Sequence, residues 1–286
     1  MEILVSAPAS CEAPRSDPLE DVVSETLGRK LVWCAAPLVI VATLLSAAGF
    51  SAATAANKDT LRGSITVSAA SSLTAAFTQI AAKFHKLHPH TTIVYNFGSS
   101  TTLANQILAG APVDVFASAD LTDMDTVVTG GYVHVAANIF TRNQMEIAVK
   151  HGNPTGITGL GSLANAPVVA ECGTTVPCGI DAANVLKHAG VNIPANDVTR
   201  QPNSQSTVDQ VSYGDATAAI VYVTDVNSQG KLVSGVKIPA NQNIIADYPI
   251  ARLSTSANSK LAQAFVSFVE SKNGQRSLTA QGFLAR

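Results

Sequence analysis

The sequence has few charged residues, few aromatic residues and no strong charge of either sign. Asp, Glu, Lys and Arg make up 13% of the 286 residues, about half the usual share. With 47% hydrophobic residues, this composition argues against a disordered chain. The formal net charge of −2 shows no basic surplus of the kind that marks a nucleic-acid-binding protein. The length suffices for about two domains with a sizeable core.

The motifs of several common enzyme classes are also missing. The sequence contains no G-x-S-x-G elbow, no P-loop and no H-E-x-x-H pair. A Ser/His/Asp triad assembled from distant residues stays open as an alternative. We therefore expect a binding protein that is not an enzyme.

The N-terminal segment has the pattern of an export signal. Arg29 and Lys30 precede an uncharged run over residues 31–57, and residues 53–55 form an A-x-A triplet of the kind that precedes cleavage. We expect residues 1–55 to be a signal peptide with an N-terminal extension, and the rest to be periplasmic or otherwise extracytoplasmic. The run is also long enough to span a bilayer, so membrane tethering stays open.

After that segment, the chain keeps two cysteines and almost no net charge. Cys172 and Cys178 have five residues between them. An isolated pair in an oxidising compartment predicts a disulfide, whereas a metal site would need two further ligands. From Ala56 onward, fifteen Lys and Arg stand against fourteen Asp and Glu. A bound anion would therefore not be attracted by a large positive field.

Strand-like runs and helical patterns alternate along this part of the chain. The predicted strands cover residues 64–68, 91–97, 113–117, 145–149, 167–170, 218–223 and 248–253. Helices are predicted over residues 72–87, 181–188, 207–213 and 260–270, and another begins near residue 103. The first helix should bury one face, formed by Leu73, Phe77, Ile80, Phe84 and Leu87. The alternation predicts an α/β protein with parallel sheets covered by helices.

Four small polar loops join a predicted strand to a helix. They cover residues 68–73, 97–103, 169–180 and 198–207. In open α/β sheets, ligands bind at this edge, where free N–H groups and the helix dipole favour an anion without needing a cation. Helix capping explains any one such loop, but four of them in a charge-poor chain favour an anion-binding site.

Several stretches resemble a known family. Residues 67–74 (VSAASSLT), 96–104 (NFGSSTTLA) and 109–120 (AGAPVDVFASAD) resemble motifs of the exported molybdate-binding proteins of ABC transporters, and residues 176–179, 219–222 and 282–283 follow in the expected order. The resemblance implies a two-lobed type II periplasmic-binding-protein fold. Each lobe would be a mixed sheet flanked by helices, with the ligand in the cleft between the lobes. One lobe would comprise residues 58–145 plus 248–286, and the other residues 146–247.

The resemblance also implies which residues bind the anion. Ser72 and Ser100 would use hydroxyl and backbone N–H groups, and Tyr222 would use its hydroxyl. Cys178 and Ser204 would contribute backbone N–H groups. All of these are donors, which suits a fully ionised tetrahedral oxyanion, whereas phosphate keeps a proton near neutral pH and needs an acceptor.

The expected function is therefore the capture of molybdate, and also of tungstate, for delivery to an inner-membrane ABC permease. Molybdenum would be bound as the molybdate oxyanion, through the same residues. The protein would be a monomer and would need no cofactor. Another tetrahedral oxyanion, such as sulfate, is the alternative.

Two other binding classes stay open. His85, His88 and His90 lie within six residues, so they suit zinc as well as a solvated helix end. An organic carboxylate would call for an arginine clamp, and the four loops supply only Arg200.

Overall fold

The structure is a computed structural model that describes residues 61–286. The chain divides into two units, residues 1–54 and residues 55–286, and the described residues belong to the second unit. The predicted signal segment and its cleavage triplet lie outside the described residues. Within residues 61–286, no helix is both long enough and apolar enough to cross a membrane.

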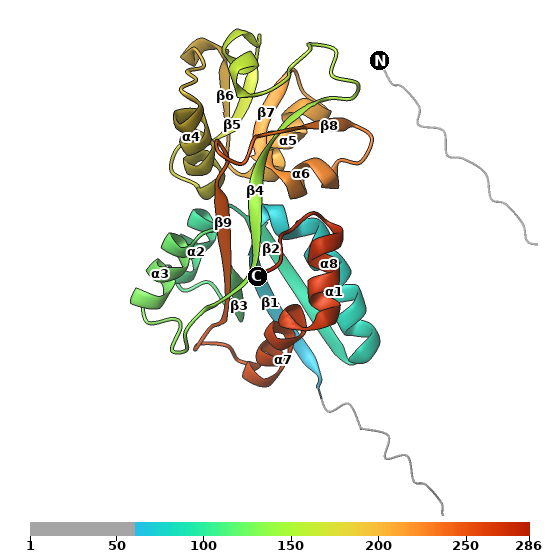
Figure 1. The fold of residues 1–286 in the computed structure, drawn as a ribbon. Helices are drawn as coiled ribbons and strands as arrows, with labels where there is room; N and C mark the ends of the chain where they lie inside the picture. The colour runs from blue at the N-terminus through green and yellow to red at the C-terminus, as the bar shows by residue number, and fades with distance from the viewer. Residues whose placement is uncertain (1–60) are drawn as a thin grey trace, which may run out of the picture. The chain divides into compact units, whose positions relative to one another are not determined.

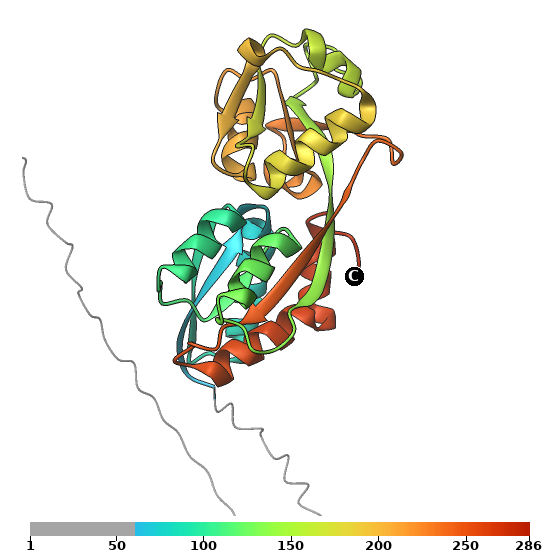
Figure 2. The same ribbon diagram turned by 90° about the vertical axis from the view of Figure 1, so that its left-hand side faces the viewer.

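Nine strands form the sheets of the described part. They are β1 (Gly63–Ala70), β2 (Thr91–Gly98), β3 (Val115–Ala117), β4 (Asn138–Lys150), β5 (Val169–Cys172), β6 (Val198–Gln201), β7 (Ala218–Tyr222), β8 (Val233–Lys237) and β9 (Ile245–Arg252). Their order is β2-β1-β3-β9-β4-β7-β5-β6, with β8 paired to β4. Figures 1 and 2 show β1, β2 and β3 in one lobe and β5 to β8 in the other.

The sheets are mixed rather than wholly parallel. β1 runs parallel to β2 and β3, and β5 runs parallel to β6 and β7. In contrast, β9 is antiparallel to β3, and β4 is antiparallel to β7, β8 and β9. The simple alternation of strands and helices was wrong on this point, because β4 and β9 run between the lobes in opposite directions. The mixed α/β class implied by the family resemblance is confirmed.

Helices pack against these sheets in both lobes (Figures 1 and 2). They are α1 (Thr74–Leu87), α2 (Ser100–Leu108), α3 (Leu121–Thr129), α4 (Pro177–Ala189), α5 (Ser204–Ser212), α6 (Val223–Ser228), α7 (Ser259–Glu270) and α8 (Lys272–Ala280). Short 3-10 helices are η1 (Ser71–Leu73), η2 (Leu160–Asn165) and η3 (Ala195–Asp197). The predicted strand and helix ranges do not include α3, α6, α8, β6 or β8, which are short or mostly polar.

Two long strands connect the lobes. Residues 138–144 of β4 pair with β9, whereas residues 145–150 of β4 pair with β7 and β8. The strand predicted over residues 145–149 is thus only the second part of β4. Because one continuous strand belongs to both sheets, a bend within β4 or β9 would change the angle between the lobes.

The first helix buries four of its five predicted core residues. Phe77 and Phe84 are fully buried, and Phe84 packs against two aromatic rings of α7. Leu73 and Ile80 are also buried, but Leu87 is 54% exposed. The prediction for Leu87 was wrong because it is the last residue of α1 and lies beyond this aromatic packing.

The start of α4 lies very close to the end of β5. A Cβ atom added at Gly179, in the first turn of α4, would overlap the backbone carbonyl oxygen of Gly173. The N–H group of Gly173 donates to Gln201 O at 2.8 Å, which ties this loop to the end of β6. Only glycine allows the helix to begin so close to the loop.

We expect Gly179→Ala to lower the free energy of unfolding by about 1–3 kcal/mol, since a backbone carbonyl cannot give way as a side chain can. Gly161→Ala is the matched control, because a Cβ there meets nothing within 4 Å. It should change stability by less than about 0.5 kcal/mol. Urea titration of both variants tests this, and equal stabilities would contradict it.

Candidate functional site

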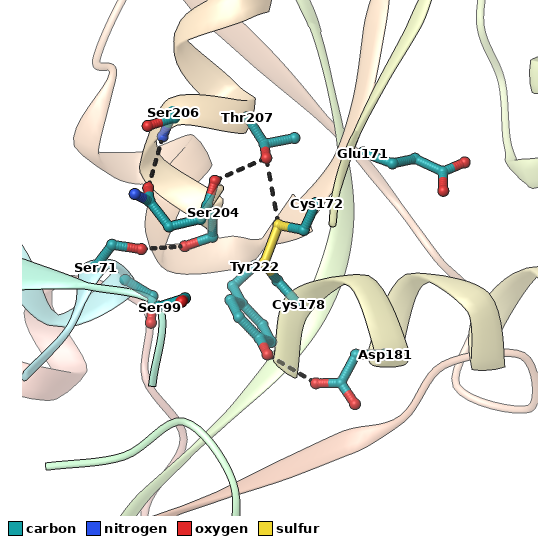
Figure 3. Close-up of a disulfide and its surroundings, with 12 residues drawn as sticks. Ser71, Ser99, Glu171, Cys172, Cys178, Asp181, Ser204, Ser206, Thr207 and Tyr222 are labelled. Atoms are coloured by element: carbon teal, nitrogen blue, oxygen red, sulfur yellow. Dashed lines mark hydrogen bonds between the residues drawn. A yellow bond between two sulfur atoms is a disulfide. The ribbon is translucent and has the colours of Figure 1, made fainter. Parts of the chain in front are cut away.

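Strand ends and helix starts from both lobes meet at one small cavity. Its volume is only about 10 Å³, room for roughly one water-sized group. The lining residues come from the ends of β1, β2 and β7, from the segments that follow β1 and β3, and from the starts of α2, α4 and α5: Ala70, Ser71, Ser72, Gly98, Ser99, Ser100, Ala119, Pro177, Cys178, Asn203, Ser204 and Tyr222. Figure 3 shows part of this arrangement.

The structure brings together all four polar loops and all five residues singled out from the sequence. Ser72 lies in η1, and Ser100 and Ser204 are the first residues of α2 and α5. Cys178 lies in the first turn of α4, and Tyr222 ends β7. Their roles in holding a ligand stay predictions, but their positions at one cavity are a structural fact.

In two of the loops, a residue that caps the following helix also lines the cavity, together with the residue after it. The side chain of Ser99 accepts a hydrogen bond from Thr102 N and caps α2, and Asn203 accepts from Ser206 N and caps α5. The next residue in each case, Ser100 or Ser204, begins the helix. The first N–H groups of a helix have no partner within it, so these helix starts can present donors to the cavity.

Ser100 has a hydroxyl proton available to the cavity, and Ser72 has one when Tyr248 is the donor in the contact between them. Ser100 Oγ accepts a hydrogen bond from Ala119 N at 2.9 Å, which leaves its own proton for another acceptor. Ser72 Oγ lies 2.8 Å from the hydroxyl of Tyr248, and Asn143 Nδ2 donates to that hydroxyl at 3.4 Å. When the Tyr248 hydroxyl donates its hydrogen bond to Ser72 Oγ, the proton of Ser72 is available for another acceptor.

A hydrogen bond between two serines links the lobes across the cavity. Ser71 Oγ lies 3.0 Å from Ser204 Oγ, as Figure 3 shows. Ser204 donates its proton to Asp225 Oδ1 at 3.0 Å, so Ser71 is the donor between the serines. Burial raises the pKa of Asp225 to about 7, although the hydrogen bond from Ser204 lowers it. The hydroxyl proton of Ser71 is thus engaged in the contact between the lobes.

The hydroxyl of Tyr222 has a partner behind the cavity. It donates to Asp181 Oδ2 at 2.7 Å (Figure 3). Burial raises the pKa of Tyr222, so this hydroxyl stays protonated. Burial also raises the pKa of Asp181 to about 6; the bond from Tyr222 lowers it and the charge of Asp120 raises it. While Asp181 is ionised, it holds the single proton that Tyr222 has to donate.

No charged side chain lines the cavity. Arg200, the cation considered for an organic carboxylate, instead pairs with Glu171 at 2.7 Å and donates to Cys172 O at 3.0 Å. The histidines considered for zinc lie at the end of α1, where His85 Nδ1 is 3.1 Å from Thr91 O. Among the described residues, no group of three or more His, Cys, Asp or Glu side chains is placed to hold a metal ion.

A family model described as bacterial extracellular solute-binding protein matches residues 65–284, nearly all of the described part. The chain belongs to this family.

The relatives of this solute-binding protein include named oxyanion receptors. The molybdate-binding protein ModA of Mycobacterium tuberculosis is 34% identical over 221 residues, which cover 77% of this chain and 84% of that protein. The solved periplasmic molybdate-binding protein of Azotobacter vinelandii has a TM-score of 0.69 at 20% identity, covering 78% of this chain and 99% of its own. The sulfate-binding protein SubI of M. tuberculosis has a TM-score of 0.68 at 19% identity, covering 78% and 86%. These two structures show the fold.

Two neighbours of the predicted site in the solute-binding protein were missed from the sequence. Ser71 makes the contact between the lobes, and Asp181 accepts the proton of Tyr222. Asp181 could have been predicted from its spacing, because it follows Cys178 by three residues and so lies on the same face of the helix. Ser71 lay in a quoted motif, but adjacent serines give no sign of which one faces the ligand.

The solute-binding protein has a disulfide at the edge of the cavity. Cys172 at the end of β5 and Cys178 in α4 are bonded, with their Cα atoms 5.8 Å apart (Figure 3). Cys172 Sγ also lies 3.3 Å from Thr207 Oγ1 of α5. The bond therefore holds the start of α4 against the strand end that precedes it.

We expect replacement of both Cys172 and Cys178 by serine to lower the free energy of unfolding by about 2 kcal/mol, the chain-entropy value for so short a loop. Chemical denaturation of the variant measures this directly. A reductant should destabilise the unmodified protein by a similar amount and leave the double variant unchanged. A reductant effect of equal size on both proteins would show that it does not act through this bond.

Proposed function

We propose that this protein captures molybdate, and also tungstate, outside the cytoplasm and delivers it to an ABC permease in the membrane. The observation that carries this proposal is the cavity lined by residues with hydroxyl groups and by the starts of three helices, and by no charged side chain. A fully ionised oxyanion needs donors only, and charge-assisted hydrogen bonds to it are strong. The sequence likeness to a named molybdate-binding protein favours this oxyanion over others.

The ligand set proposed for the anion combines both lobes. Ser72 and Ser100 would donate from one lobe, and the helix starts at Cys178 and Ser204 from the other, with Tyr222 completing the set. The positive ends of α2, α4 and α5 add a favourable potential at the cavity. This arrangement would neutralise an anion without a cationic side chain.

The cavity as it stands is too small for a tetrahedral oxyanion, because it holds about one water-sized group. Binding would therefore lengthen the contact between Ser71 and Ser204, which spans the lobes at 3.0 Å. Bending within β4 and β9 would move the lobes apart to admit the anion. We propose that lobes of residues 58–145 plus 248–286 and of residues 146–247 then close on it, with Ser71 and Ser204 farther apart than the 3.0 Å of this structure.

The remaining parts of the proposal concern the form of the protein in the cell. Residues 1–55 would direct export as a cleaved signal peptide. The protein would act as a monomer and would need no cofactor. Closure of the lobes on the anion would be the change that the permease detects.

Thermal unfolding with different oxyanions tests the function. A ligand present at a thousand times its dissociation constant stabilises the folded state by about 4 kcal/mol, which raises Tm by several degrees. We expect molybdate and tungstate to raise Tm, and sulfate and phosphate to have no effect. A shift with sulfate alone would support the alternative oxyanion, and the absence of any shift in ligand-free protein would overturn the proposal.

We expect Ser100→Ala to weaken molybdate binding by about 1.5–3 kcal/mol, because it removes a hydrogen bond to a charged group. Calorimetric titration measures the change in dissociation constant. Ser259→Ala is the matched control, since Ser259 is an exposed first residue of α7, and it should bind as the wild type does. An unchanged dissociation constant in Ser100→Ala would remove this serine from the ligand set.

A further inference from the structure

Tyr222 lies at the cavity, but its proton points elsewhere. A hydroxyl has one proton, and here that proton goes to Asp181 Oδ2 at 2.7 Å. With the proton so placed, Tyr222 can offer the cavity only lone pairs, which repel an oxyanion. Every other ligand proposed for the anion is a donor, so Tyr222 conflicts with the set while Asp181 is ionised.

We propose that Asp181 decides whether Tyr222 can donate to the anion, so that anion binding takes up one proton at Asp181. The inference rests on the proposed function and deepens it. In the bound state, a proton from solvent resides on the Asp181 carboxyl and is donated to Tyr222 Oη. The hydroxyl proton of Tyr222 then turns to an anion oxygen, and no proton is lost from the protein.

The surroundings of Asp181 favour this uptake. The group is half-buried in α4, and the charge of Asp120, the N-cap residue of α3, acts on it. Burial and Asp120 together raise the pKa of Asp181 to about 6. A doubly charged anion beside Tyr222 adds a further like charge and raises this pKa again.

The other acidic groups near α4 are engaged elsewhere. On β5, Glu171 pairs with Arg200, and on β4, Glu146 lies beside Lys237. Two further elements pack against α4: β7 contributes Tyr222 itself, and η2 contains no titratable residue. Asp225 in α6 acts on Tyr222 but accepts hydrogen bonds from Ser204 Oγ and from the backbone N–H of Tyr222. Asp181 is therefore the carboxyl that bonds to the Tyr222 hydroxyl.

The sign of the pH dependence follows. Below about pH 6, the carboxyl of the free protein already carries its proton, and affinity should not depend on pH through this group. Above about pH 6, each bound anion must recruit a proton, so affinity should fall by up to about tenfold per pH unit. Asn at position 181 imitates the protonated acid, because its amide can donate to Tyr222 Oη.

Calorimetric titration with molybdate at about pH 8, in two buffers of different ionisation heat, counts the protons taken up. We expect the wild type to take up close to one proton per anion. Asp181→Asn should take up almost none, bind about tenfold or more tightly than the wild type at this pH, and show a flat pH profile. Asp215→Asn removes an exposed charge far along the same lobe and should behave as the wild type.

The outcomes separate the two proposals. Normal binding with no proton uptake by the wild type would overturn this inference alone. So would Asp181→Asn that binds more weakly at every pH, since that result would make Asp181 a structural residue. No binding heat with any oxyanion would overturn the proposed function and this inference with it.

Discussion

The cavity depends on helix starts whose N–H groups have no partners within their own helices. Such groups must be satisfied by caps, by water or by a ligand. Here Ser99 and Asn203 cap α2 and α5, and the residue after each cap lies at the cavity. The parallel strands determine this placement, because their ends and the helices that follow them meet at one edge. A cavity lined by neutral polar groups, with no cationic side chain, follows from that topology.

Rigid and adjustable contacts are divided around this site. The Cys172–Cys178 disulfide and the close approach of Gly179 to Gly173 hold the start of α4 in place. In the proposed binding, the contacts that would change are single hydrogen bonds, from Ser71 to Ser204 and from Tyr222 to Asp181. Geometry set by covalent and steric constraints lowers the cost of ordering donors around an anion. The movable hydrogen bonds leave room for the ligand to enter.

Buried carboxyl groups link this uncharged cavity to pH. Asp181 and Asp225 lie behind Tyr222 and Ser204 and accept their protons. A carboxylate there competes with an anion for the same donors, so the protonation of the acid and the occupancy of the cavity are linked. Receptors built from neutral donors can therefore respond to pH even though no charged side chain touches the ligand.

The sequence by itself determined the alternation of strands and helices, the four polar loops and the donor chemistry of the five residues that reach the cavity. These features are local: periodicity reports burial, and small polar residues report strand-to-helix turns. Only the tertiary structure decided that β4 serves both lobes, that Leu87 lies outside the core, and where each hydroxyl proton points. The hydroxyl proton of Ser71, Ser204 or Tyr222 points to a partner that is more than 20 residues away in the sequence. A local sequence pattern cannot predict such a partner.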